Sequence, residues 1–360
     1  MNFSSSTTPF LSLHPPPPSS SPGLSQILST VCLTLAFILG FPGNLFVMWT
    51  VLCRVDRRSV TCLLVLNLAT ADALVLLSTP FFMRYVIGGQ GWEFGSAFCK
   101  LVHYLCGINM YASIFLITAM SLDRFLAVSR PFLSQQLRTK KALLKTLLVI
   151  WSLAFLFAIP MPIYRRNMTT NIYISVSSDG VLFYCIPCHS DPKHLVFQFL
   201  LETIAGFLIP FSIILFCSLY FCWKLRSVFE NKSKSRQIIL SIVVAFFVFW
   251  MPYHIVNLIQ VSGTLAVEES LSKALLDVVV TIKPTVTAFT FCSNSINPVL
   301  YVFAGSSYIQ SDGINFMAVM LEKTNSEMPG SRSFPQSSRA RWIESLGSGD
   351  SPENKTLHVK

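Results

Sequence analysis

The sequence predicts an all-α membrane protein that folds as a bundle of seven transmembrane helices. Of the 360 residues, 52% are hydrophobic and only 12% are charged, whereas about 25% are charged in a soluble protein. The apolar residues also gather into seven blocks, each reaching the ~20 residues that a helix needs to cross the hydrocarbon core. Because backbone N–H and C=O groups find no water there, blocks of this length are expected to be helical. The blocks cover roughly residues 26–52, 60–87, 97–125, 142–164, 195–223, 238–262 and 271–303.

The basic residues predict which side of the membrane each loop faces. One set of three loops holds 13 Lys or Arg and two acids, whereas the loops of the other set hold five basic residues and six acids. The first set is therefore expected in the cytosol, which places the N-terminus outside and the C-terminus inside. The net charge of +10 follows from loops that face anionic membrane lipids, so no nucleic-acid partner is predicted. The first set comprises 54–58, 130–145 and 224–236, and the second includes 84–93, 165–193 and 264–277.

The chain is expected to divide into four parts. Residues 1–25 are rich in Ser and Pro and carry no charge, which predicts a disordered extracellular N-terminus. The seven-transmembrane bundle covers 26–303, and a short cytosolic helix is expected at 304–323. Residues 324–360 are polar and predict a disordered cytosolic tail.

Cysteines and sequons predict covalent features on the outer side. Cys99 stands at the outer start of the third helix, and Cys185 lies in the long outer loop between helices four and five. A disulfide between them is expected in these oxidising surroundings, with Cys188, three residues after Cys185, as a competing partner. The sequons that begin at Asn2 and Asn167 also fall outside and are expected to carry glycans.

Every apolar block contains a polar residue or a proline at a depth where hydrocarbon is expected. These features are Asn44, Asp72, Asp123 beside Arg124, Trp151, Pro210, Trp250 with Pro252, and Asn297, Pro298 and Tyr301 of SINPVLY. Any one of them could be a packing detail. Together, and in this order, they resemble the rhodopsin-like G-protein-coupled receptors, and the resemblance covers residues from about 40 to 303.

The resemblance implies a switch at the cytosolic ends of the helices. Asp123 and Arg124 resemble the family's Asp-Arg-Tyr motif, in which the acid holds the Arg at rest and the freed Arg meets the G protein. Tyr301 is then expected to swing toward Arg124 on activation, and Trp250 to transmit ligand contact to helix six, which Pro252 kinks. The alternative is that Asp123 and Arg124 are interface charges that reach toward lipid headgroups. The implied switch residues are Asp123, Arg124, Trp250, Pro252, Asn297, Pro298 and Tyr301.

The sequence departs from the family pattern in helix five. Ser218 stands where the family commonly has a tyrosine that stabilises the active form. Tyr220 is out of phase with that position, and whether it substitutes stays open at this point.

Asp72 is a carboxylate inside an apolar block, and such a residue is a functional candidate by default. The resemblance implies an allosteric sodium site, because oxygen ligands suit a hard cation. The alternative is a structural hydrogen-bond hub that Asp72 forms with Asn44 and Asn297. No other cofactor is expected. The implied sodium ligands are Asp72, Asn109, Ser113, Asn294 and Asn297.

The outer half of the bundle predicts a ligand with a negative charge. Residues 100–113 contain no acid, so an amine ligand is not expected, whereas Arg84, His103, Arg165, Arg166 and Lys283 supply bases. Each base alone could equally be an interface charge. Lys283 is flanked by apolar residues and a proline, so it is expected to face the bundle and to bind a carboxylate.

Further stretches resemble the leukotriene B4 receptors of the chemoattractant lipid branch. They include SLDRFLAVSRPF, IPMPIYRRN, FLLETIAGFLIPF and MPYHIVNLIQ. The resemblance implies a hydroxylated fatty acid as ligand, with Arg165 or Lys283 meeting its carboxylate. The implied ligand-binding residues are His103, Tyr111, Arg165, Glu202, Tyr253, Asn257 and Lys283.

The partners and the competing functions follow from the same residues. The lipid branch implies a Gi-type G protein, arrestin and receptor kinases as partners, a plasma-membrane location, and signalling in chemotaxis and inflammation. A receptor for a formylated peptide or another small carboxylate is the alternative. A transporter or channel is not expected, because no continuous polar path crosses the blocks. No enzyme is expected either, because no nucleophile, base and orienting group fall at workable spacing.

Overall fold

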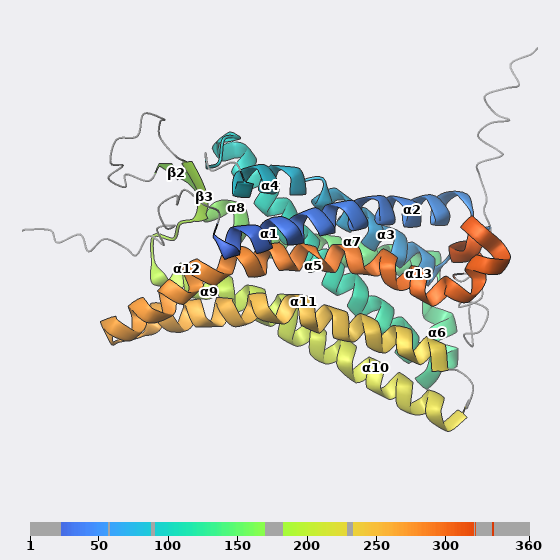
Figure 1. Ribbon diagram of the computed structural model, residues 1–360. Helices are drawn as coiled ribbons and strands as arrows, with labels where there is room; N and C mark the ends of the chain where they lie inside the picture. The colour runs from blue at the N-terminus through green and yellow to red at the C-terminus, as the bar shows by residue number, and fades with distance from the viewer. Residues whose placement is uncertain are drawn as a thin grey trace, which may run out of the picture.

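Seven helical spans make up the protein, as the sequence predicted. The computed structural model describes residues 23–56, 58–87, 91–169, 183–228, 233–319, 321 and 333–334. Within these ranges, seven helical segments are long and apolar enough to cross a membrane. They run side by side as one bundle (Figure 1). The spans are built from α1 (Leu24–Leu35) with η1 (Ala36–Gly40) and α2 (Phe41–Cys53); α3 (Val60–Leu76) with α4 (Thr79–Ile87); α5 (Gly95–Ser129); α7 (Lys140–Ala158) with α8 (Pro160–Ile163); α9 (Pro192–Thr203) with η2 (Ile204–Leu208) and α10 (Ile209–Val228); α11 (Ser233–Leu265); and α12 (Glu269–Phe291) with α13 (Ser293–Asp312).

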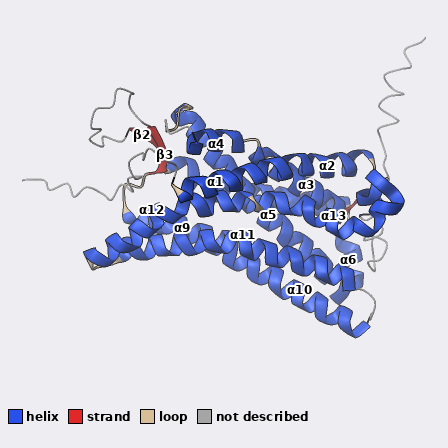
Figure 2. Cartoon of the chain, in the orientation of Figure 1, coloured by secondary structure: helices blue, strands red, loops and turns tan. Residues whose placement is uncertain are grey.

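Short elements close the two ends of the bundle. The strands β2 (Arg165–Thr169) and β3 (Phe183–Pro187) form an antiparallel pair at one end, and the helix α6 (Pro131–Leu137) lies at the other (Figures 1 and 2). The strands β1 (Arg58–Ser59) and β4 (Ser333–Phe334) form a second two-residue pair, and η3 (Gly313–Asn315) follows α13. The hairpin was not anticipated from the sequence, because its strands carry no apolar alternation. We call its end of the bundle the disulfide end and the opposite end the Arg124 end.

Prolines account for two departures from regular α-helix. The π-helical turn η1 ends two residues before Pro42, and η2 ends two residues before Pro210. A proline has no N–H and its ring collides with the carbonyl four residues earlier, so the preceding turn widens. The widened η2 lies in the fifth span, next to the buried acid Glu202 described below.

Glycine lets the first span approach the seventh. A Cβ atom on Gly43 would lie 2.8 Å from Cβ of Pro298, closer than real Cβ atoms come to a neighbour. One residue on, the Asn44 amide donates to the carbonyls of Gly40 (2.9 Å) and Asn294 (2.8 Å). The buried Asn44 therefore joins the backbones of the two spans.

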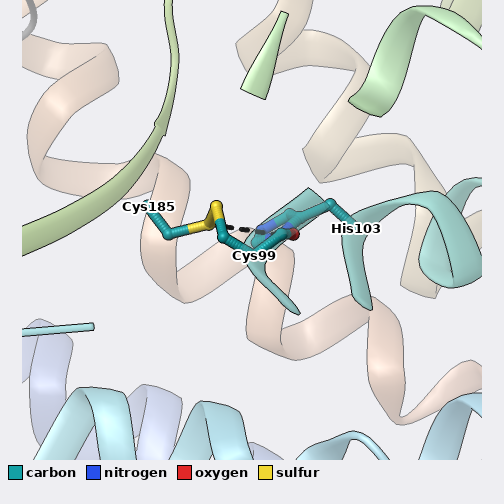
Figure 3. A group of neighbouring side chains, drawn as sticks. All are labelled: Cys99, His103 and Cys185. Carbon is teal, nitrogen blue, oxygen red and sulfur yellow. Dashed lines mark hydrogen bonds between the residues drawn. A yellow bond between two sulfur atoms is a disulfide. The ribbon is translucent and has the colours of Figure 1, made fainter. Parts of the chain in front are cut away.

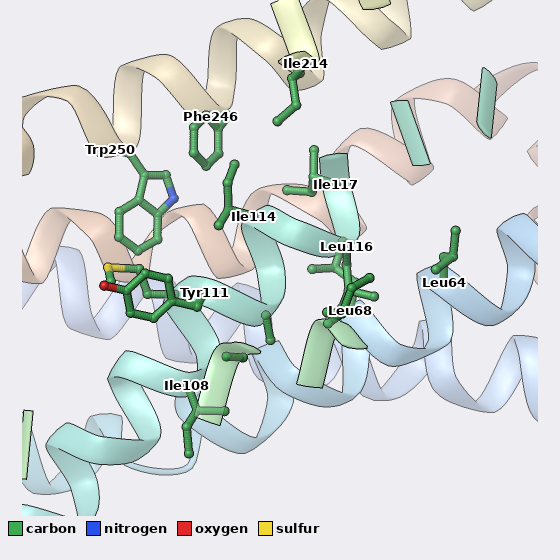
Figure 4. Packing of buried hydrophobic residues seen from close by; sticks show 14 of the residues in the cluster. Leu64, Leu68, Ile108, Tyr111, Ile114, Leu116, Ile117, Ile214, Phe246 and Trp250 are labelled. Carbon is green, nitrogen blue, oxygen red and sulfur yellow. The ribbon is translucent and has the colours of Figure 1, made fainter. Parts of the chain in front are cut away.

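The main apolar core lies around α5, which crosses the centre of the bundle. Leu68, Tyr111, Ile114 and Leu116 are almost completely buried, and Trp250 closes the cluster from α11 (Figure 4). Close packing of this kind transmits small displacements rather than absorbing them. A displacement at one end of the core is therefore expected to reach the other end.

The chain beyond the seventh span folds back onto the first two. α13 continues to Asp312, and after one 3-10 turn the residues Phe316, Met317 and Ala318 are buried against Val51 and neighbouring side chains. Of the predicted tail, only β4 belongs to the described residues, and of the predicted N-terminal segment only 23–25. Asn2 lies outside the described residues, whereas Asn167 lies in β2.

Candidate functional site

The predicted disulfide attaches the hairpin to the third span. Cys99 near the start of α5 is bonded to Cys185 of β3 across 86 residues, and Cys188 is free. His103 lies one turn further on, with Nδ1 2.9 Å from the Cys99 carbonyl and 3.5 Å from Cys185 Sγ (Figure 3). Cys99, His103 and Cys185 lie close enough for a metal site, but bonded sulfurs are not the thiolates that ligate metals. The group is therefore structural, and the ring of His103 packs edge-on against Phe82.

A buried carboxylate in the fifth span gathers predicted ligand residues around it. Glu202 of α9 is 2% exposed. Its Oε2 accepts hydrogen bonds from the Tyr253 hydroxyl at 2.8 Å and from the Asn257 amide at 3.2 Å. Its Oε1 accepts one from Gln198 Nε2 at 2.8 Å. The structure thus brings together three residues named from the sequence and adds Gln198, one helical turn before Glu202, which sequence reasoning missed.

The network continues from Gln198 toward the surface. The Nε2 atom of His189 lies 2.8 Å from Gln198 Oε1, and because an amide oxygen only accepts, the imidazole donates. Burial lowers the pKa of His189, against the opposing effect of the Gln198 hydrogen bond, and nearby Lys283 lowers it further. The ring packs 4.6 Å from that of Tyr164. A histidine in a loop carries no periodic signal, so sequence reasoning could not place it.

Two basic residues lie at the disulfide end above this network. Lys283 of α12 donates to Gln260 Oε1, and its Nζ lies 3.7 Å from the centre of the Phe199 ring. Arg165 begins β2; burial lowers the pKa of its guanidinium, whereas Tyr253 and Glu202, which are close enough to act on it, raise that pKa. Within the described ranges neither side chain forms an ion pair. The predicted placement of Lys283 toward the bundle is what the structure shows.

Three buried polar atoms near Glu202 have no partner among the described residues. They are the Tyr111 hydroxyl, Nε2 of His254 and Oδ1 of Asn257. Tyr111 packs against Phe157, and the ring of His254 lies 4.8 Å from that of Phe207. Buried polar groups are nearly always hydrogen-bonded, so three unpaired groups beside one carboxylate require an explanation.

Deeper in the bundle, Asp72 forms a second, closed network. Its Oδ1 accepts from Asn109 Nδ2 at 3.1 Å and from the Ser113 hydroxyl at 3.0 Å, and its Oδ2 accepts from Asn297 Nδ2 at 3.0 Å. Four of the five predicted residues therefore meet. Asn294 contributes its backbone carbonyl to Asn44, and among the described contacts its side chain does not reach Asp72.

The Arg124 end differs from the sequence prediction in one respect. Asp123 does not hold Arg124: its Oδ1 accepts from Arg138 Nε at 2.9 Å and its Oδ2 from Arg138 Nη2 at 2.7 Å. The physical reason is that Arg138 engages both oxygens of the carboxylate, which leaves neither of them for Arg124. Arg138 comes from the segment between α6 and α7, and no pattern in the sequence points to this pairing.

Arg124 instead lines a cavity between the second, third, fifth, sixth and seventh spans. The cavity has a volume of about 30 Å³, and Ser218, Asn297 and Tyr301 also line it. Tyr220 does not take the place of the missing helix-five tyrosine, because its ring packs 4.8 Å from that of Phe125.

Trp250 lies between the Glu202 network and this cavity. Its ring stacks 6.1 Å from that of His254 on one side and 6.2 Å from that of Phe246 on the other. Pro252 lies inside α11 and Pro298 inside α13. The arrangement provides a continuous packed path from the buried acid toward the Arg124 end.

Comparison with known proteins places these features in a family. Residues 43–301 match the family described as 7 transmembrane receptor (rhodopsin family). The chain is 39% identical to human leukotriene B4 receptor 1 over 317 residues, which are 88% of each chain. It is 36% identical to human leukotriene B4 receptor 2, over 86% of this chain and 84% of that one. It is also 32% identical to the C3a anaphylatoxin chemotactic receptor of Oncorhynchus mykiss, over 84% of this chain and 80% of that one.

Proposed function

We propose that this chain, which belongs to the rhodopsin family of G-protein-coupled receptors, binds a hydroxylated fatty acid, leukotriene B4. Members of this family are multi-pass plasma-membrane receptors and not enzymes. The two human relatives named above are both leukotriene B4 receptors, and each aligns with most of this chain. Their names support the ligand class, and the geometry at the disulfide end supplies the chemical argument.

The observation that carries the proposal is the placement of two cations above a hydrogen-bonding acid. Lys283 and Arg165 are the groups that attract a carboxylate, and neither has an ion pair within the described residues. Glu202 lies close enough to act on both. In a site that contains little water, a cation whose charge is only partly neutralised attracts an anionic ligand strongly.

The unpaired polar atoms fit the hydroxyl groups of such a ligand. The Tyr111 hydroxyl can donate, Asn257 Oδ1 can accept, and Nε2 of His254 can do either according to its tautomer. A ligand hydroxyl both donates and accepts, so it satisfies groups that a pure hydrocarbon leaves unpaired. The aromatic side chains of Phe199 and Phe207 suit the chain of a lipid.

The Arg124 end is proposed to face the cytosol and to bind a Gi-type G protein. The excess of Lys and Arg in the loops at this end supports the orientation, with the N-terminus outside. The cavity that Arg124 and Tyr301 line is the expected contact for the G protein. Arrestin and receptor kinases are proposed as further partners of the same face.

Sodium is proposed as an allosteric ligand of the Asp72 network. The Asp72 carboxylate and the Ser113 hydroxyl offer the oxygen atoms that this cation prefers. Asn109 and Asn297 turn their amide nitrogens toward Asp72, so each would have to rotate its amide to contribute an oxygen. The donor set therefore fits a sodium ion after rotation of these amides.

The test is inhibition of cyclic AMP formation in cells that express the chain, with and without pertussis toxin. We expect leukotriene B4 to act at lower concentrations than related hydroxy-fatty acids, and the toxin to abolish the response. Arg124→Ala is the matched control, which should bind the lipid and fail to signal. Silence to every lipid, with the receptor measured at the cell surface, would overturn the proposed ligand class.

A peptide ligand is the second candidate, and the similarity to the C3a anaphylatoxin receptor favours it. The same cells are therefore titrated with C3a and formylated peptides. A response to a peptide at lower concentrations than to any lipid would replace the first proposal with this one.

A further inference from the structure

Arg138 forms a buried two-pronged ion pair at the Arg124 end. Its Nε and Nη2 atoms each donate to a different oxygen of Asp123, at 2.9 and 2.7 Å, and the side chain of Arg138 is 5% exposed. Thr61 of α3 adds a longer contact of 3.4 Å to Oδ2. Paired hydrogen bonds of this kind fix the orientation of the carboxylate as well as its charge.

The ion pair occupies the acid that precedes Arg124 in the sequence. Asp123 is close enough to act electrostatically on Arg124, yet both of its oxygens are engaged by Arg138. Arg124 has no ion pair within the described residues and lines the cavity with Tyr301 and Asn297. Two guanidinium groups therefore compete for one carboxylate.

The backbone ties Arg138 to an element that a partner protein can reach. The N–H of Arg138 donates to the Ser134 carbonyl at 3.0 Å, at the end of α6. The next residue, Thr139, caps α7 by accepting from the N–H of Ala142 at 3.2 Å. Phe132 of α6 is 83% exposed, so a protein that contacts α6 acts on the segment that carries Arg138.

We propose that Arg138 is a positioning residue of the G-protein switch, which holds Asp123 away from Arg124 and so keeps Arg124 directed into the cavity. The inference rests on the proposed function, because it requires Arg124 to contact the G protein. When the Arg138 pair opens, Asp123 becomes free to hold Arg124, and the receptor is biased toward rest. Removal of Arg138 and removal of Asp123 then have opposite effects on signalling, although each breaks the same ion pair.

A four-receptor cycle tests this opposition: the unchanged chain, Arg138→Gln, Asp123→Asn and the double variant. Membranes from expressing cells are assayed for nucleotide exchange on Gi, without ligand and with leukotriene B4, at matched surface receptor numbers. We expect Arg138→Gln to lower basal exchange and to reduce agonist potency on the order of tenfold, within the usual range of coupling between sites. Asp123→Asn should raise basal exchange, and the double variant should match Asp123→Asn alone.

The match between the double variant and Asp123→Asn is the decisive result. If Arg138 acts only through Asp123, then replacing Arg138 should not alter nucleotide exchange further once the charge on Asp123 has been removed. The proposal would be overturned if Arg138→Gln lowered nucleotide exchange equally in the unchanged chain and in Asp123→Asn. Arg138 would then act through direct contact with the G protein or through folding. Unchanged exchange and potency in Arg138→Gln would overturn it as well.

Two further variants test whether a positive charge alone is sufficient or whether the two-pronged contact of Arg138 is needed. Lys141→Gln removes an exposed positive charge from the start of α7 and is expected to leave exchange unchanged. Arg138→Lys keeps the charge but makes a single contact, so its nucleotide exchange should lie between that of Arg138→Gln and that of the unchanged chain. Ligand-free exchange reports on Arg138 even if leukotriene B4 proves to be the wrong ligand, so failure of the inference is distinguishable from failure of the proposed ligand.

Discussion

Asp72 and Glu202 are buried carboxylates in one bundle, 0% and 2% exposed, yet their surroundings differ. Each accepts three hydrogen bonds from side chains. Around Asp72, the donors Asn109, Ser113 and Asn297 come from the third and seventh spans and close the network. Around Glu202, unpaired polar atoms and two cations remain at the edge.

The difference predicts that the two acids have different roles. A closed network is most stable without a ligand, because removing any one of its groups leaves a hydrogen-bond partner unsatisfied. An open network becomes more stable when a ligand supplies the missing hydrogen-bond partners. Asp72 is therefore expected to set stability and the balance between receptor states, whereas Glu202 is expected to set ligand affinity.

The largest effect is expected from the disulfide that attaches the hairpin to the third span. Cys99→Ser and Cys185→Ser each release the hairpin, with a loss of about 2–5 kcal/mol in stability. Both should abolish ligand binding at the cell surface alike, as measured by surface labelling and radioligand binding. Cys188→Ser is the control and should leave both unchanged; loss of binding in this variant would assign the covalent link to Cys188.

The next effect is expected from the cations. Lys283→Ala and Arg165→Ala should each weaken binding of a carboxylate ligand by about 2–5 kcal/mol, because a desolvated charge loses its partner. Binding of the methyl ester, measured by competition, should change far less. The exposed Lys273, also on α12, supplies the control Lys273→Ala. Equal losses for acid and ester would remove the ion-pair argument.

A matched pair of neutral substitutions tests the comparison itself. Asp72→Asn places an amide against three donors and should lower stability by about 1–3 kcal/mol, while ligand affinity changes little. It should also remove any effect of sodium on agonist affinity. Glu202→Gln also places an amide against three donors and should lower stability by a similar amount, but it should in addition weaken ligand binding. Melting temperatures in detergent and saturation binding measure both, and identical profiles would mean that the two acids do not differ in role.

The smallest effect is expected at the Tyr111 hydroxyl. Since this group has no partner among the described residues, Tyr111→Phe should leave the ligand-free receptor as stable or more stable. Affinity for a hydroxylated ligand should fall by about 0.5–1.5 kcal/mol, the usual value of one hydrogen bond. Tyr104→Phe is the control, because Tyr104 donates to the Phe155 carbonyl at 3.2 Å. An unchanged affinity in Tyr111→Phe would place the ligand elsewhere.

The sequence by itself determined the seven spans and the family. Apolar block length is a one-dimensional property, so it is readable without a structure. The same holds for Lys283, whose apolar neighbours along one helix already indicated that it faces the bundle. Cys99 and Cys185 could be paired from their positions, although Cys188 was a competitor until the structure separated them.

Only the tertiary structure decided which polar groups meet across the helices. The rotation of each span about its axis and the path of the loops depend on the packing of the whole bundle, and no local pattern encodes them. Arg138 replaced Arg124 as the partner of Asp123, and Gln198 and His189 extended the Glu202 network. Asn294 joined the seventh span to Asn44 rather than to Asp72. Local periodicity fixes the face of a helix on which a residue lies, whereas its partner is set by the element packed against that face.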